Sequence, residues 1–317
     1  MENLSFQFQK FKMKKGYLDI SFSWIFAIIV GAIILFGAVY GIVKFSQGIE
    51  HRTTTQGAKE LTNFFNPLES GMESAKSSSI KFPVESRVYL SCESFTDLGA
   101  QGISLSEKIR KKWSEKSEEI KFRDNYVFSD SIEEGKNFYV FSKPFDFPFR
   151  VATFIYFSSS SKKYCFIDAP REIEREIQKM EQENLILEDE CVGDELKVCF
   201  RNSNNCDILV ESNSVKKDGK ILYYQGSALM YAAIFSDPEI YECNLQRVMG
   251  RINLLSKIYK EKDLLLEVNG CSTNMYQSLI NLETLSNSYE SSKDLSSFNS
   301  VIMDLESKNR YVECKLW

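Results

Sequence analysis

Eight cysteines are the residues with the clearest chemistry in this chain of 317 residues. Their number is even, and none of them occurs in the first 91 residues. An even set on one side of a chain is typical of disulfides formed in an oxidising compartment. Zinc is the alternative, but no C-x-x-C pair occurs, and the spacings after Cys191 do not match zinc knuckles. We therefore expect disulfides among Cys92, Cys165, Cys191, Cys199, Cys206, Cys243, Cys271 and Cys314.

The chain contains a single histidine, His51, in the polar segment GIEHRTTTQG. This rarity argues against Ser-His-Asp and Cys-His catalysis, H-E-x-x-H metalloprotease sites and multi-histidine metal centres. Neither a G-x-x-x-x-G-K-[ST] loop nor a G-x-G-x-x-G loop occurs, so the known phosphate-cradling motifs are missing too. The formal charge of -5 disfavours a nucleic-acid partner. We expect no cofactor, no metal and no nucleic acid.

Two segments could supply chemistry that needs no histidine, and a third is the one local cluster of basic residues. The acidic segment LEDECVGDE, 187–195, supplies carboxylates for glycoside hydrolysis, or oxygen ligands for calcium. The segment SSSSKKY, 158–164, offers a serine beside lysines, although its composition is that of a surface loop. The basic segment EKIRKKWSEK, 107–116, is interleaved with glutamates and predicts a solvated helix or loop face. None of these patterns defines a reaction, because catalytic sites are defined by geometry.

Residues Ile20 to Val43 are uncharged, in a chain of which 26% is charged. About 20 helical residues cross a bilayer, whereas a cleavable signal has a shorter apolar stretch. Trp24 and Tyr40 lie near the two ends, where aromatic rings prefer the headgroup layer. We therefore expect an uncleaved signal anchor. Four lysines precede it, at 10, 12, 14 and 15, which predicts a cytoplasmic N-terminus and an extracytoplasmic C-terminal domain.

Small residues repeat along this apolar segment. Ala27 with Gly31, and Gly37 with Gly41, form two small-x-x-x-small pairs. Such pairs allow two membrane helices to approach closely, although glycine is also common in membrane helices in general. Lateral self-association is thus one hypothesis for this segment.

We predict an α+β protein with a single transmembrane helix, a β-rich extracytoplasmic domain and a C-terminal helical module. The predicted regions are a cytoplasmic basic N-terminus 1–19, a transmembrane helix 20–43, a stalk 44–80, an α+β domain 81–240 and a helical module 241–317. In the stalk, Leu61, Phe64, Phe65 and Leu68 recur at helical spacing, so the anchor helix is expected to continue until Pro67 ends or kinks it nearby.

Short β-branched and aromatic runs between turn residues predict strands. They begin near residues 87, 125, 136, 150, 163, 195, 206 and 220. The segment 168–183 predicts a helix with Asp168 as N-cap and Ile173, Ile177 and Met180 on one face. The segment VCFRNSNNCDI suggests a hairpin, and GSALMYAAIFSDPEIYEC fits either a strand or a buried helix.

The predicted helical module constrains the cysteine pairing. An up-down-up arrangement brings the end of the third helix to the start of the second, which favours Cys271–Cys314. Cys199–Cys206 is a plausible local bridge. Cys243 is left to join the helices to the strands, with Cys191 as its suggested partner. Cys92–Cys165 then follows by elimination.

The segment KKGYLDISFSWIFAIIVGAIILFGAVYGI, from Lys14 to Ile42, resembles the N-terminus of archaeal type IV pilin-like proteins. In that family a peptidase cuts after the glycine, the apolar helix packs subunits into a filament, and a β-rich head is displayed. The resemblance implies a cut between Gly16 and Tyr17.

The sequence favours a single-pass, disulfide-stabilised protein of the cell envelope that binds or scaffolds other molecules without catalysis. Its expected partners are membrane lipid and other envelope proteins. An archaeal or bacterial envelope fits the glycosylation pattern, because the one N-x-[ST] sequence is at Asn3, on the predicted cytoplasmic side. A pilin-like filament subunit is the first alternative, and a carboxylate-dependent envelope hydrolase is the second.

Overall fold

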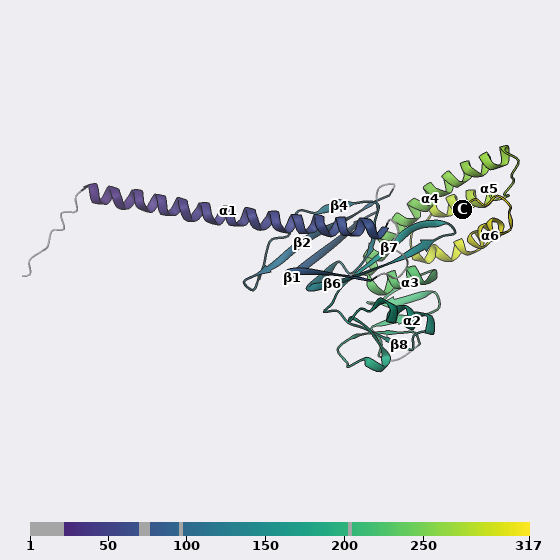
Figure 1. Cartoon of the computed structure of the whole chain (residues 1–317), viewed down its shortest axis with the longest axis horizontal. Coiled ribbons are helices and arrows are strands. Elements are labelled where there is room, and N and C mark those ends of the chain that lie inside the picture. The colour runs from purple at the N-terminus through teal and green to yellow at the C-terminus, as the bar shows by residue number, and fades with distance from the viewer. Residues whose placement is uncertain (1–21, 70–76, 95–97, 202–204) are drawn as a thin grey trace, which may run out of the picture. The chain divides into compact units, whose positions relative to one another are not determined.

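The structure is a computed structural model that describes residues 22–69, 77–94, 98–201 and 205–317 (Figure 1). Side chains at 22–23, 42–55, 64 and 66–69 are not among those described. The chain divides into two compact units, Met1–Glu50 and His51–Trp317. The predicted cytoplasmic segment 1–19 and the processing site at Gly16 and Tyr17 lie outside the described residues.

Helix α1 spans Phe22–Glu69. Its window Trp24–Gly41 has a mean hydropathy of 2.3 and is 0% buried. Among the described residues it is the one helix that is long and apolar enough to cross a membrane. This apolar helix matches the predicted span 20–43. A signal sequence can have the same length and hydropathy. The helix ends two residues beyond Pro67, as its sequence predicts.

The C-terminal part of α1 belongs to the folded domain. Ala58, Leu61 and Phe65 are buried in a core with Val88 of β1 and Phe157 of β7. The helical spacing predicted for this segment therefore marks a packing face. The prediction of a stalk over 44–80 is wrong at its C-terminal end, because these side chains cover a sheet and strand β1 already begins at Ser78.

The first sheet is mixed. Its strands lie in the order β3 (Lys112–Trp113), β2 (Ala100–Ile109), β1 (Ser78–Glu93), β6 (Ile132–Asp146), β7 (Arg150–Ser159) and β5 (Tyr126–Phe128), with β4 (Ile120–Phe122) also paired to β2. On β7, Phe154 and Tyr156 enter one hydrophobic core, and Ile155 and Phe157 enter the other. Strand β7 is buried from Val151 to Ser159 because both of its faces are covered.

Strand β2 and the β2–β3 hairpin were not predicted. Residues 107–116 end β2, turn at Arg110 and Lys111, and form β3, so the expected helix or loop is wrong. Ala100, Gly102 and two serines weaken the strand signal of β2, although it also contains Ile103 and Ile109. Its pairing with β1 from Ser86 to Glu93 fixes it as a strand.

The second sheet is also mixed, and its strands are short, with three or four residues each. Its order is β13 (Lys220–Tyr223), β12 (Ser214–Lys217), β11 (Ile208–Val210), β10 (Leu196–Cys199), β8 (Tyr164–Ile167) and β9 (Leu185–Leu187). Strands β10 and β11 pair in parallel, so the hairpin predicted at 199–206 is wrong.

Helix α2 (Arg171–Met180) and the 3-10 turn η1 (Glu188–Glu190) flank β9. Ile173, Ile177 and Met180 are buried on one face of α2, as predicted. Pro170 is the N-cap, however, and Asp168 is not, because its φ of 53° places it in a turn before the helix.

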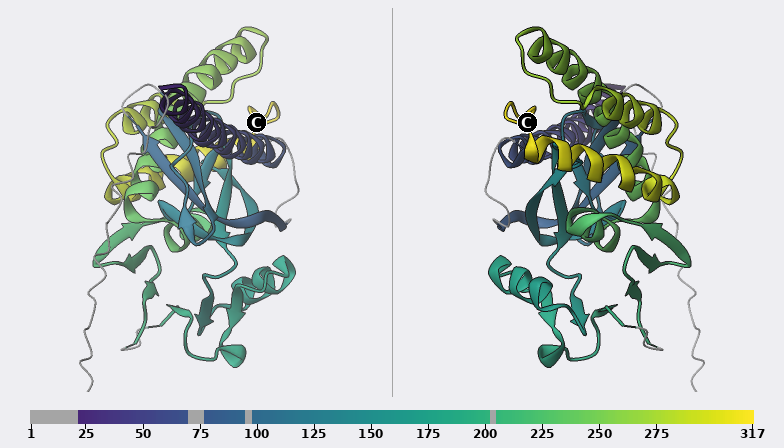
Figure 2. Two further views of the ribbon diagram at one scale, coloured as in Figure 1. Left: turned by 90° about the vertical axis from the view of Figure 1, so that its left-hand side faces the viewer. Right: turned by 90° about the vertical axis from the view of Figure 1, so that its right-hand side faces the viewer.

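The C-terminal helices are α3 (Gly226–Phe235), α4 (Pro238–Val268), α5 (Tyr276–Asn287) and α6 (Asn299–Tyr311), with the 3-10 segment η2 (Ser292–Phe298) before α6. The segment GSALMYAAIFSDPEIYEC, which fits either a strand or a buried helix by its sequence, forms α3 and the start of α4. The helices therefore begin before residue 241, the predicted start of the helical module. These helices share one hydrophobic core with strands of both sheets. Figure 2 shows α4 projecting from the opposite end of this unit to α2.

All eight cysteines are paired. Cys199–Cys206 and Cys271–Cys314 confirm two predictions. The predicted pairs Cys92–Cys165 and Cys191–Cys243 are wrong, because the bonds are Cys92–Cys243 and Cys165–Cys191. Cys92 ends strand β1, which packs against α4, while Cys165 and Cys191 lie in and beside the second sheet. Cys243 does join the helices to the strands, as expected.

Arg247 of α4 lies beside this long-range bond and is 1% exposed. Its guanidinium donates to the carbonyl oxygens of Leu98, Arg123 and Asn125 at 2.7–3.3 Å, and to two side-chain oxygens. Burial lowers its pKa to about 10. Gly99 has a φ of +56°, and a Cβ there would lie 2.7 Å from Arg247 Cγ. The arginine thus anchors two loops of the first sheet to α4.

Candidate functional site

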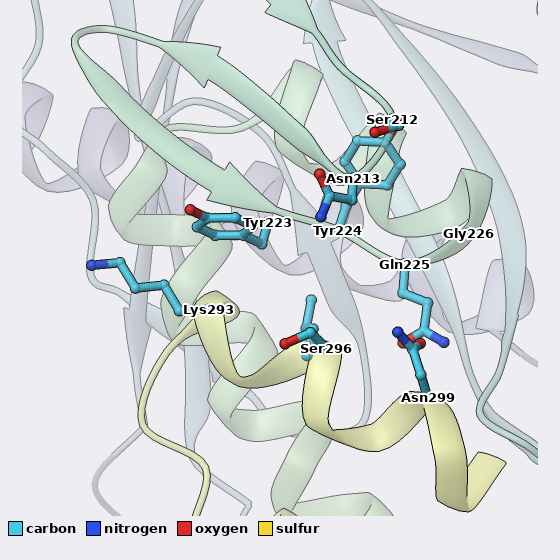
Figure 3. Close-up of a pocket in the computed structure, with 10 residues that line it drawn as sticks. Ser212, Asn213, Tyr223, Tyr224, Gln225, Gly226, Lys293, Ser296 and Asn299 are labelled. Atoms are coloured by element: carbon cyan, nitrogen blue, oxygen red, sulfur yellow. The ribbon is translucent and has the colours of Figure 1, made fainter.

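A polar pocket of about 270 Å³ opens between the second sheet and the C-terminal helices (Figure 3). We use the name polar pocket for the cavity lined by Ser212, Asn213, Tyr223, Tyr224, Gln225, Gly226, Lys293, Leu295, Ser296 and Asn299. The lining comes from the β11–β12 turn, the β13–α3 junction, η2 and the first turn of α6. Because η2 runs directly into α6, the lining comes from three separate stretches of sequence, and no linear motif marks the pocket.

The backbone around the polar pocket is fixed by hydrogen bonds. Tyr224 donates its N–H to the Asn213 carbonyl at 3.0 Å, which joins the β13–α3 junction to the β11–β12 turn. Tyr223 donates its N–H to Ser292 Oγ at 3.1 Å, which joins the end of β13 to η2. Gly226 has a φ of +78°, a conformation that favours glycine and lets the strand turn into α3.

The side chains lining the pocket have unused hydrogen-bonding capacity. Those of Asn213, Gln225, Ser296 and Asn299 form no hydrogen bond with another residue that the structure describes. The buried Gln225 Oε1 lacks a donor. Buried polar groups are normally paired, so this one is suited to a ligand or water. In Figure 3, Gln225 and Asn299 lie beside each other, and Lys293 extends away from them.

A second group of polar residues is buried between the sheets. We call Asp130, Glu133, Lys162 and Lys217 the ionic cluster. Lys217 Nζ lies 3.1 Å from Asp130 Oδ1, and Lys162 contacts the other oxygen of Asp130. Lys162 Nζ is 3.6 Å from Glu133 Oε1, too far for a hydrogen bond, and Glu133 accepts the N–H of Ser159 at 2.8 Å. The cluster joins β6 and β12 to the β7–β8 connection.

Burial perturbs the ionic cluster strongly. Desolvation raises the pKa of Glu133 to about 8 and lowers the pKa of Lys162 to about 8. Desolvation also lowers the pKa of Lys217, which donates to the carbonyl oxygens of Ile234 and Ser236 at the end of α3. Perturbed groups often mark active sites, but structural ion pairs are perturbed too. None of these four residues lines the polar pocket, so we assign them a structural role in joining the elements that they connect.

The segment 158–164 contributes to this cluster. Ser158 and Ser159 are buried at the end of β7, and Lys162 makes the buried contacts above. The expectation of a surface loop is therefore wrong for Ser158 and Ser159, but residues 160–163 do form a turn in which Ser161 and Lys163 are exposed. The sequence did not reveal these contacts because a run of serines and lysines is polar. The partners of this segment, Asp130 and Glu133, lie about 30 residues away in sequence.

A serine and a lysine do meet in another part of the fold, at Ser227 and Lys143. Lys143 Nζ donates to Ser227 Oγ at 3.0 Å and to both carboxylate oxygens of Glu176 at 2.8 and 2.7 Å. An ammonium has three N–H donors and no lone pair. All three donors are engaged, so this lysine is not arranged to accept a proton from the serine.

The acidic segment 187–195 forms η1 and a loop closed by Glu195. This carboxylate accepts the N–H of Gly193 at 2.7 Å and of Val192 at 3.3 Å. The hydrogen bond from the Gly193 N–H contributes most to lowering the pKa of Glu195, and the one from the Val192 N–H acts in the same direction. Within the described residues, no group of three His, Cys, Asp or Glu side chains is placed to hold a metal. The arrangement thus orders a loop through one carboxylate.

The basic segment 107–116 forms a surface hairpin. The Arg87 guanidinium lies 4.0 Å from the centroid of the Trp113 ring, and Lys108 lies 5.3 Å from it. Both cations also pair with glutamates, Glu134 and Glu85. Arg110 and Lys111 at the turn are exposed, as predicted for a solvated face, but the glutamates that pair with Arg87 and Lys108 lie outside 107–116.

The small residues of α1 are open. A Cβ added at Gly31, Gly37 or Gly41 would meet nothing within 4 Å, and Ala27 is exposed. Self-association through them stays a prediction.

No protein-family model matches this chain, and no curated protein or solved structure is significantly similar to it.

Proposed function

We propose that this chain is a single-pass membrane protein whose disulfide-stabilised domain lies outside the cytoplasm and binds or scaffolds other envelope molecules without catalysis. The observation that carries the proposal is the complete pairing of eight cysteines in four disulfides within residues 92–314. Disulfides persist in oxidising compartments. The exposed apolar window Trp24–Gly41 supplies a segment that suits lipid.

The proposed orientation rests on the positive-inside rule. The lysines at 10, 12, 14 and 15 precede the apolar window, and they favour a cytoplasmic N-terminus. All eight cysteines follow the window, on the opposite side. Charge bias and disulfide placement are independent arguments, and both favour the same orientation.

The binding role is supported by the polar pocket. Its ten lining residues include amides, hydroxyls and two tyrosine rings, but no carboxylate. A glycoside hydrolase of the usual kind needs two facing carboxyl groups. This lining is better matched to holding a polar ligand than to cleaving one.

A labelling experiment in sealed cells tests the topology. Ser5→Cys places a thiol before the apolar window, and Asn281→Cys places one on the exposed surface of α5. With an impermeant maleimide, we expect Asn281→Cys to react in intact cells and Ser5→Cys to react only after lysis. In the unmodified chain, all eight native thiols should be unreactive until a reductant is added.

The reverse labelling pattern, or free native thiols in the denatured unreduced protein, would contradict the proposal. The mass of the mature N-terminus separates three forms of the chain. A mass beginning near Met1 supports the uncleaved anchor. One beginning at Tyr17 supports a pilin-like filament subunit instead, and one beginning beyond Val43 shows that the apolar helix is a removed signal.

A further inference from the structure

We propose that the polar pocket binds a saccharide unit, a neutral ligand rich in hydroxyl groups. The inference rests on the proposed binding function and names its ligand class. Three properties of the lining support it: hydrogen-bonding groups without partners, two tyrosine rings of which one is held in place, and a small size.

The hydrogen-bonding groups suit hydroxyls. A carboxamide carries both donors and acceptors, and a hydroxyl can serve as either, so amide side chains pair readily with a sugar. Asn213, Gln225 and Asn299 are the amides at the pocket, and their side chains form no hydrogen bond with other described residues. The buried Gln225 Oε1 needs a donor, which a ligand hydroxyl would supply.

The charge of the lining argues for a neutral ligand. Lys293 is the one charged residue among the ten, and its amino group points away from Gln225 and Asn299 in Figure 3. A phosphate or carboxylate ligand would be expected to find clustered cations. A cationic ligand would be expected to find a carboxylate. Neither is offered by these side chains.

Two tyrosine rings supply the apolar part of the site. Tyr223 and Tyr224 are half-buried at the pocket. The Tyr224 hydroxyl donates to the Glu211 carbonyl at 2.6 Å, which fixes the ring. The face of an aromatic ring is electron-rich and attracts polarised C–H groups such as those on a sugar ring. An immobilised ring also loses little entropy on binding.

Size and backbone pairing favour a sugar unit over a peptide. Pockets for drug-sized ligands measure about 300–1,000 Å³, and the polar pocket, at about 270 Å³, suits one ring. A peptide commonly adds a strand to a free sheet edge. Strand β13 is at the edge of its sheet, but the Tyr223 N–H is already bonded to Ser292 Oγ. The edge is therefore closed at the pocket.

Saturation-transfer NMR on the full chain in lipid nanodiscs tests the proposal without a sugar-based detergent. The probes are methyl glycosides of common hexoses and N-acetylhexosamines, and the blocked peptide N-acetyl-Ala-Ala-Ala-amide, at concentrations on the order of 10 mM. Two variants alter the pocket: Gln225→Met and Asn299→Ala. Asn281→Ala is the matched control, because it removes an exposed amide on α5 outside the pocket.

We expect saturation transfer to at least one glycoside. Its affinity should fall about two- to tenfold in each pocket variant, which corresponds to one lost neutral hydrogen bond, and should be unchanged in Asn281→Ala. No transfer to any glycoside, equal transfer in the pocket variants, or transfer only to the peptide would overturn the saccharide assignment. Those results would leave the thiol-labelling pattern unaltered, so the failure of the ligand assignment is distinguishable from the failure of the proposed topology.

Discussion

Loss of the Cys92–Cys243 disulfide should destabilise the folded domain more than loss of any local bridge. This bond joins residues separated by 151 positions, whereas Cys199–Cys206 joins residues separated by 7. In the chain-entropy description, a closed loop of n residues lowers the entropy of the unfolded chain by 2.1 + 1.5R ln n cal/mol/K. At 25 °C this gives about 5 kcal/mol for the long loop and about 2.4 kcal/mol for the short one.

The comparison uses two double variants. Cys92→Ser with Cys243→Ser opens the long loop, and Cys199→Ser with Cys206→Ser is the matched control. Urea unfolding is followed by the fluorescence of Trp317, which packs against Phe149 and Tyr259 in the core. We expect the midpoint to fall in both variants, and further when the long loop is opened.

Equal midpoints in the two variants would refute the reasoning from loop length. A peptide map of the unreduced protein gives a direct check, since Cys92 should be recovered bonded to Cys243. Recovery of Cys92 with Cys165 would show that the elimination argument from sequence was right and this pairing wrong.

Three further perturbations have defined outcomes. The folded protein holds the Glu133 proton that the unfolded chain releases above pH 4.5, so this contribution to stability is lost as the pH rises toward 8. In the unmodified protein, the free energy of unfolding should therefore fall by about 4 kcal/mol between pH 5 and pH 8 because of this group. In Glu133→Gln this fall should be absent, and an unchanged pH profile would contradict the argument. Arg247→Met should lower the free energy of unfolding by about 3 kcal/mol or more, because it strands buried carbonyl oxygens, and a urea midpoint equal to that of the unmodified chain would count against it. Replacing Gly37 and Gly41 by leucine should reduce crosslinked dimers in membranes if the helix self-associates, whereas an undiminished dimer fraction would exclude this face.

The local elements followed from the sequence because their signals are local. The run at 150–159 forms β7, and the apolar positions of 171–180 form the buried face of α2. The helical spacing of Leu61 and Phe65 appears as a packing face on α1. Each signal depends on neighbours within about one helical turn or a few strand residues.

Pairings between distant segments could not be obtained in this way. The composition of strand β2 gives only a weak signal for a strand, and its pairing with β1 is what makes it one. The partner of Cys92 depends on α4 packing against β1, and the ionic contacts of Lys162 depend on Asp130 and Glu133, which lie about 30 residues away in sequence. The polar pocket draws on three separate stretches of sequence, so its residues carry no shared spacing.

The sequence by itself determined an apolar helix that suits lipid, an even set of cysteines on one side of it, and most of the strands and helices. Only the tertiary structure decided which cysteines bond, which charges are buried, and which amides meet around a cavity. The physical reason is that hydrophobicity and backbone preference act over a few residues, whereas disulfides, buried ion pairs and pockets require groups brought together by the packing of the whole chain.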